Sequence, residues 1–271
     1  MAFSINEEYF SGQGICLIGL RGTDGKPLGL RPLGNVPALV LKNAVTTIEH
    51  KESQTGLRGI DLRLTTEIKA SADITIENFN SANLALTTRG DTAKVVGATV
   101  TAAPYNAYPG LVTPFPHIKL SVVSITTAGG TPVTLTPFVS DATAWDYKLN
   151  LEAGSVEFNT STGLDGSGTP PNIVYTSGVA AVLASYTYAS HNKINGLTQS
   201  APELYLRFEG LNTAEGNSPV VIEVFKFAPD PTQNLALIGD TVQQMVIIGS
   251  VLRDLKQTSG SQYYKITKID Q

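Results

Sequence analysis

The sequence predicts a mostly β protein made of antiparallel sheets, with one short helix. Four segments alternate apolar and polar side chains with the period of a strand that buries one face: 45–50, 61–65, 73–77 and 220–227. The 25 glycines and 15 prolines interrupt the apolar runs every few residues. Such dense punctuation favours strands joined by turns over long helices.

The short helix follows the third of these strands. Asn80 or Ser81 can cap it, residues 82–88 follow, and Gly90 can take the left-handed conformation that stops a helix. Two turns are not stable alone in water, so we expect the helix to lie against a sheet through Leu84, Leu86 or both. A second candidate, of a single turn, spans 231–237.

The middle of the chain differs in composition from its flanks. Residues 101–200 carry 5 acidic and 3 basic side chains, against 10 of each in residues 1–100, and hold 8 of the 15 prolines. This shift predicts an inserted small β subdomain at 103–199, between two parts of a β framework at 1–102 and 200–271. Its expected strands are 117–125, 132–139, 155–158 and 179–188, with an exposed loop at 163–172.

Charge and apolar patterning narrow the choice of partners. Charged residues make up 15% of the chain, below the ~25% typical of soluble domains, which fits either surfaces covered by partners or β faces rich in Thr, Ser and Asn. The net charge of −4 and the lack of a basic stripe predict that DNA would pass along the protein without tight binding. No run approaches the ~20 apolar residues of a membrane helix, and the acidic residues 1–10 do not form a signal peptide.

Few residues are candidates for a reactive or metal-binding role. The only cysteine, Cys16, lies in an apolar run and is expected to be a buried strand thiol. The histidines His50, His117 and His191 are far apart in sequence, and none has a second ligand at metal spacing, so we expect structural or surface roles.

Motifs for catalysis or cofactor binding are not recognisable. The chain has no nucleophile elbow and no phosphate loop, and Gly12-Gln-Gly14 lacks the rest of a dinucleotide fingerprint, so we expect a turn there. Asp141, Trp145 and Asp146 are compatible with a sugar site, but a turn that enters a strand at 147–149 explains them more simply. We therefore expect a protein that is not an enzyme and has no cofactor or metal.

A charged run, Glu49-His-Lys-Glu52, ends the first of the alternating strands. One interpretation is a solvated strand end. The other is a rim that meets a neighbouring subunit through complementary charges.

Three motifs, in this order, carry a family resemblance. They are Glu49-His-Lys-Glu-Ser-Gln-Thr-Gly56, the strand and helix of residues 72–89 (ADITIENFNSANLALTTR), and Leu206-Arg-Phe-Glu-Gly-Leu-Asn212. Together they resemble the major tail tube protein of tailed bacteriophages, over roughly residues 30–100 and 200–271.

The resemblance implies a fold and an assembly. The fold would be an antiparallel β-sandwich or barrel with one short flanking helix, and six copies would form a ring that stacks into a tube for DNA ejection. Residues 51–59 would be the loop that joins one ring to the next, with Gln54-Thr-Gly56 supplying its conformational freedom. The candidate assembly residues are Glu49, His50, Lys51, Glu52, Gln54, Thr55, Gly56 and Arg58.

The resemblance also implies partners and a location. These partners are other copies of the chain, a tape measure protein in the lumen, baseplate or tail-tip and tail-terminator proteins at the ends, a sheath protein in contractile tails, and DNA in transit; no membrane is involved. The protein would be assembled in the host cytoplasm and reside in the virion tail. Two alternatives stay open: a secretion-system-type tube protein, and a β-sandwich adhesin that binds a receptor through Tyr105, Tyr108 and Trp145.

Overall fold

The computed structural model describes residues 7–54, 56–140, 144–160 and 172–269. These residues form antiparallel sheets and one helix, so the predicted fold class is confirmed. The chain divides into two compact units, Met1–Thr92 with Ile194–Gln271, and Ala93–Lys193. The second unit begins earlier than the predicted insertion because β6 (Ala98–Ala107) is one of its strands. It also ends earlier, because the Gln199 N–H donates to Arg89 O in the first unit.

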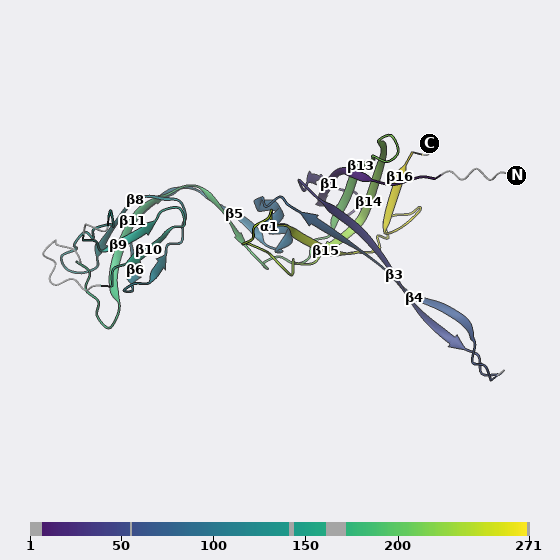
Figure 1. Cartoon of the computed structure of the whole chain (residues 1–271), viewed down its shortest axis with the longest axis horizontal. Helices are drawn as coiled ribbons and strands as arrows, with labels where there is room; N and C mark the ends of the chain where they lie inside the picture. The colour runs from purple at the N-terminus through teal and green to yellow at the C-terminus, as the bar shows by residue number, and fades with distance from the viewer. Residues whose placement is uncertain (1–6, 55, 141–143, 161–171, 270–271) are drawn as a thin grey trace. The chain divides into compact units, whose positions relative to one another are not determined.

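The first unit contains one sheet in the order β2-β1-β13-β14-β15-β4-β3, with β16 paired to β14 (Figure 1). Its strands are β1 (Gly12–Leu20), β2 (Arg31–Pro32), β3 (Ala38–Lys51), β4 (Ile60–Ile76), β13 (Leu204–Asn212), β14 (Ser218–Pro229), β15 (Met245–Val251) and β16 (Tyr264–Lys268). Side chains from β1 and β4, which are far apart in this order, share one core, so the sheet curls around it. The largest fully buried members of that core are Leu33, Ile74, Ile76, Leu206, Phe227 and Met245.

Strand β1 corrects one expectation and confirms another. Gly12 and Gly14 begin a strand and not a turn. A Cβ at Gly14 would lie 2.3 Å from Glu209 O, so glycine allows β1 to lie close to β13. Cys16 is a buried strand thiol, as predicted, and burial raises its pKa to about 11.

The helix α1 (Ser81–Thr87) lies where the sequence predicts it, with a different C-terminal stop. Asn80 is the N-cap, and its side chain accepts the Asn83 N–H. The left-handed residue is Arg89, with φ of 47°, and not Gly90. The Gly90 N–H donates to Ala85 O and the Arg89 N–H to Leu86 O, which is a Schellman motif with Arg89 at its left-handed position. Gly90 is needed for space, since a Cβ there would lie 2.4 Å from Asn195 O.

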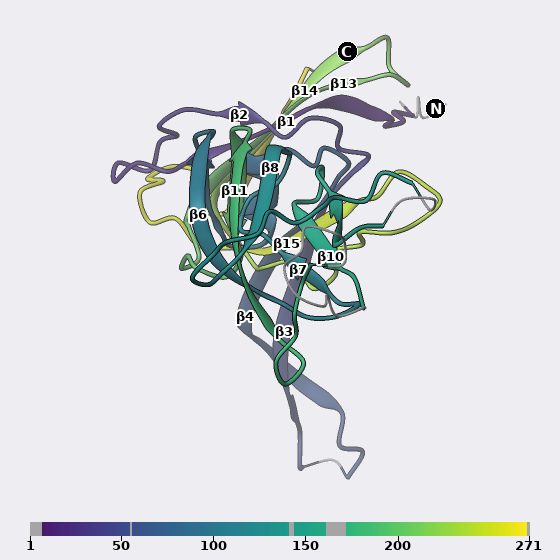
Figure 2. The same cartoon turned by 90° about the vertical axis from the view of Figure 1, so that its left-hand side faces the viewer.

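The second unit is a sandwich of two small sheets. One has the order β6-β11-β8 (Figure 2) and the other β7-β10-β9, and their facing side chains share a separate core. The remaining bounds are β5 (Asp91–Val95), β7 (Val112–Pro114), β8 (Leu120–Thr127), β9 (Tyr147–Asn150), β10 (Ser155–Phe158), β11 (Ala180–Tyr188) and β12 (His191–Asn195). Strands β5 and β12 pair with each other, and the boundary between the units falls within them.

Several local expectations are wrong or lie outside the described residues. Residues 132–139 make only isolated bridges, at Thr134 and Pro137, and residues 231–237 contain no helical turn. The strand predicted at 117–125 begins at Leu120. Most of the loop expected at 163–172 lies outside the described residues.

Candidate functional site

Strands β3 and β4 extend beyond the body of the first unit as a two-stranded arm (Figure 1). The two strands pair from Ala38 opposite Thr75 to Lys51 opposite Ile60. Two register shifts, at Thr46/Thr47 and at His50/Lys51, each place one extra residue on β4. Such bulges increase the local twist of a ribbon.

The inner half of the arm belongs to the core, and the outer half does not. Ala70, Ala72, Ile74 and Ile76 alternate with partly exposed residues, as expected of a strand with one buried face. From residue 60 to residue 69 every residue of β4 is exposed. The prediction of one buried face is therefore wrong for segments 45–50 and 61–65, because no described residue of the first unit covers either face of the ribbon there.

Large apolar side chains lie on both faces of this outer half. Val45 pairs with Ile68, and they are 57% and 56% exposed. Ile48 pairs with Leu64, and they are 59% and 52% exposed. Residues three apart on a strand point to opposite faces, so the two pairs lie on opposite sides of the ribbon. A ribbon with apolar groups in water on both sides lacks the packed face that stabilises a sheet.

The predicted assembly residues lie together at the tip of the arm. His50 Nδ1 is 2.6 Å from Asp61 Oδ1, and Arg63 Nε is 4.0 Å from Glu49 Oε1. These exposed pairs arrange the side chains but add little stability.

The turn of the tip is held by local hydrogen bonds. The Glu52 N–H donates to Gly59 O at 2.8 Å, and the Glu52 carboxylate accepts the Gln54 N–H at 2.8 Å. Gly56 and Arg58 have φ of 77° and 51°. Lys51 ends β3, and Thr55 lies outside the described residues.

Sequence reasoning missed the apolar residues of the arm. Leu57, in the middle of the polar loop, is 87% exposed, and Ile60 and Leu62 are also exposed. The signal in the sequence was an isolated leucine in a Gly-rich turn, together with apolar residues at both odd and even positions of the two strands.

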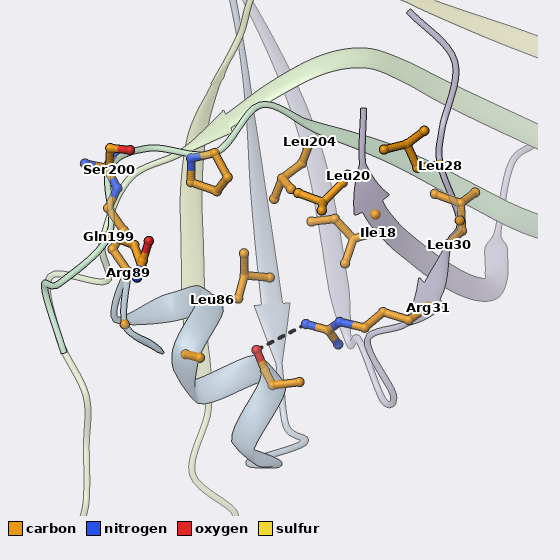
Figure 3. Close-up of a pocket in the computed structure, with 16 residues that line it drawn as sticks. Ile18, Leu20, Leu28, Leu30, Arg31, Leu86, Arg89, Gln199, Ser200 and Leu204 are labelled. Atoms are coloured by element: carbon orange, nitrogen blue, oxygen red, sulfur yellow. Dashed lines mark hydrogen bonds between the residues drawn. The ribbon is translucent and has the colours of Figure 1, made fainter. Parts of the chain in front are cut away.

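A second feature of the first unit is a groove of about 750 Å³ beside α1 (Figure 3). Its lining is mainly aliphatic and includes Ile18, Leu20, Leu28, Leu30, Leu86 and Leu204. Arg31 extends from β2 toward α1, where it donates to Asn83 Oδ1 at 2.7 Å and to Ala82 O at 3.2 Å. Asn83 is fully buried and is itself held by Leu33 O and Asn78 O, so the guanidinium is fixed in place. Burial lowers the pKa of Arg31.

The described residues considered for chemistry have structural partners, and Asp141 lies outside the described residues. Asp146 is fully buried and accepts hydrogen bonds from the Thr136 N–H at 2.7 Å and the Asn172 N–H at 2.5 Å, which fits the turn interpretation and not a sugar site. His117 stacks on Tyr188 with ring centroids 3.6 Å apart, and His191 lies 6.0 Å from His117. The described residues contain no group of three side chains that could hold a metal.

The aromatic residues named for an adhesin have different ring contacts. Tyr105 packs edge-on against Phe115, with ring centroids 4.9 Å apart. Trp145 packs against Phe138 in a different cluster, where the Lys148 ammonium lies over both rings. Tyr108 is 41% exposed.

The fold and the arm define a mostly β protein of two units with a projecting two-stranded ribbon. Over residues 9–267 the chain matches the family described as protein of unknown function UCP028589, and it belongs to that family. No curated protein matches the chain. Among the described residues, no helix has the length and apolar character needed to cross a membrane.

Proposed function

We propose that the chain is a structural subunit that assembles with copies of itself into a tube, as the tail tube proteins that it resembles do. The observation that carries this proposal is the outer half of the arm, which exposes Val45 and Ile68 on one face and Ile48 and Leu64 on the other. Contact with neighbouring subunits would remove these side chains from water and give the ribbon the packed faces that it lacks.

The energy available from such contact is appreciable. Fully burying an aliphatic side chain of this size contributes about 1.5–3 kcal/mol. The four side chains are each about half exposed, so covering them contributes on the order of 3–6 kcal/mol per arm. A contact of this strength, repeated at every subunit, would offset part of the cost of association.

The arm suits a head-to-tail assembly. Its outer half extends away from the body of the first unit, so it can reach a surface of a neighbouring copy other than that copy's arm. A contact between two different surfaces is heterologous and propagates as a filament unless a rotation closes it into a ring. By the resemblance, six copies form each ring, and the tip at residues 51–59 joins successive rings.

Charge supports conduction of DNA over tight binding. The net charge is −4, and the tip carries the mixed charges of Glu49, Lys51, Glu52 and Arg58. A wall without concentrated basic charge does not hold phosphates by counterion release, so a nucleic acid can slide. By the same resemblance, the tape measure protein occupies the lumen during assembly, and terminator, tail-tip and sheath proteins meet the ends and the outside.

The test is the assembly of the purified full chain, followed by sedimentation and electron microscopy. We expect hollow particles with sixfold symmetry for the wild type, and much smaller species for the double variant Ile48→Thr/Leu64→Thr. Threonine keeps the strand propensity, and both positions are exposed, so the fold should persist. Val174→Thr, at an exposed position of the second unit, is the control and should assemble normally. A wild type that remains monomeric at high concentration contradicts the proposal.

A further inference from the structure

The groove beside α1 contains a guanidinium that no described carboxylate neutralises. Arg31 donates to the neutral oxygens of Asn83, Ala82 and Pro32. A guanidinium has five N–H donors, so part of its capacity stays free. The aliphatic walls of the groove limit the water that can solvate it. An anionic group carried on an apolar segment would therefore be stabilised there.

The chain itself exposes a segment with this chemistry, the loop at 236–243. Leu237, Ile238 and Val242 are 75%, 97% and 72% exposed, so their apolar surface has little contact with the rest of the chain. Asp240 lies between them and forms no ion pair with any described residue. The loop thus offers aliphatic side chains and a carboxylate, and the groove offers aliphatic walls and a guanidinium.

The loop does not lie against the groove of its own copy. It precedes β15 and lies beside Glu77 and Val246, whereas the groove is formed by β1, β2 and α1. The segment that leads into the loop reaches α1, where the Thr232 N–H donates to Thr87 O, but the lining of the groove includes no residue of 230–244. Figure 2 shows the yellow-green loop before β15 at the right-hand side, away from β2 at the upper left. The segment that can fill a groove is therefore the loop of another copy.

We propose that the groove beside α1 binds the 236–243 loop of a second copy of this chain, with Leu237 and Ile238 on the aliphatic wall and Asp240 paired with Arg31. The inference rests on the self-assembly proposed above and names the contact between neighbours within one layer of the assembly. Groove and loop are different surfaces on different sides of the first unit, so the contact is heterologous and can close into a ring.

Disulfide trapping between two full-length variants tests the contact directly. Leu28→Cys places a thiol at the groove, and Ile238→Cys places one on the loop; both positions are exposed, and the native Cys16 is buried. Oxidation of the mixture should give a mixed disulfide dimer. Val139→Cys, at an exposed position of the second unit, is the matched control and should not couple to Leu28→Cys. Coupling no stronger than this control overturns the contact, and so does preferential coupling of Leu28→Cys to Leu57→Cys, which would place the arm in the groove.

Charge exchange gives a second, independent readout. Asp240→Arg changes an exposed side chain, so the fold should persist while assembly weakens by about tenfold or more. Combining it with Arg31→Glu should recover part of the loss, with circular dichroism to check that α1 and the sheet remain folded. Wild-type protein that never assembles overturns this contact together with the proposed function. Wild-type assemblies that Asp240→Arg leaves unchanged overturn this contact alone.

Discussion

Val122, in β8, adopts φ of 50° although its side chain is β-branched and 83% exposed. The left-handed region brings Cβ close to the following carbonyl oxygen, and at this position little packing offsets the cost. The residue lies where β8 shifts register against β11, between the pairs Ser185–Ser124 and Thr187–Ser121. The strain therefore belongs to a bulge in the sheet of the second unit.

Val122→Gly should stabilise the protein by about 1 kcal/mol, because glycine adopts this conformation without the steric cost. Urea denaturation measures the change in the free energy of unfolding. Val112→Gly, at an exposed position with ordinary backbone, is the control and should destabilise the protein. A Val122→Gly protein that unfolds at lower urea than the wild type contradicts this account of the bulge.

Asp254 ties the loop after β15 to the loop after β1. Its side chain is almost fully buried and pairs with Arg21. Burial by itself raises the pKa of the Asp254 carboxyl, but hydrogen bonds from the Gln257 side chain and the Lys256 N–H, together with Arg21, hold the pKa below its ordinary value. A carboxyl with a lowered pKa contributes stability above its unfolded pKa and loses it as the pH falls through the folded pKa.

Asp254→Asn should destabilise the protein by about 1–3 kcal/mol at neutral pH, because the largely buried Arg21 loses its closer carboxylate and keeps only Glu203, at 3.7 Å. The variant should also lose part of the acid dependence of stability below about pH 4, which urea titrations between pH 3 and 7 measure. Glu152→Gln, at an exposed position of the second unit, serves as control. Identical pH profiles for Asp254→Asn and the wild type would exclude this role.

At the scale of elements, the arm shows what alternation can predict. The pattern located β3 and β4 because a strand needs only its own period of two. The pattern did not show that the outer half of the ribbon extends beyond the body of the first unit. A strand that packs on its own core and a strand that packs on another molecule have the same alternation. Helix α1 was located from its cap for the same local reason. The sequence assigned the C-terminal stop of the helix to Gly90, because glycine adopts the left-handed conformation most readily. The left-handed conformation of Arg89 is stabilised by distant contacts, including the hydrogen bonds of its side chain to Pro229 O, which local sequence does not reveal.

Replacing residues 51–59 with a short Gly/Ser linker should leave the core folded and block elongation. The described residues of the loop form local hydrogen bonds at the end of an exposed ribbon, so its removal should cost little stability. Circular dichroism checks the fold, and sedimentation measures the length of the assemblies. Tubes of normal length from this variant would place the contact between rings elsewhere.

At the scale of the whole molecule, the two separate hydrophobic cores explain why composition revealed two parts but not their limits. Low charge and many prolines characterise the second unit as a whole. The boundary between the units falls inside the β5–β12 pair, where the composition of the sequence does not change. The groove beside α1 could not be predicted from the sequence either, because its lining residues come from β1, β2, α1 and the segment before β13, which are far apart in the chain.

The second unit should be dispensable for assembly. Replacing residues 97–189 with an Asn-Gly turn converts β5 and β12 into a hairpin and keeps the core of the first unit intact. We expect this variant to assemble into rings, as observed by electron microscopy, because the arm and the groove belong to the first unit. A folded but strictly monomeric variant would show that residues 97–189 take part in the tube wall.

The most direct measurement is a density map of the assembled particles at a resolution that shows side chains. We expect sixfold rings in which neighbouring copies cover Val45, Ile48, Leu64 and Ile68 of each arm. Particles in which both faces of the outer arm remain in solvent, or an assembly without a continuous pore, would contradict it.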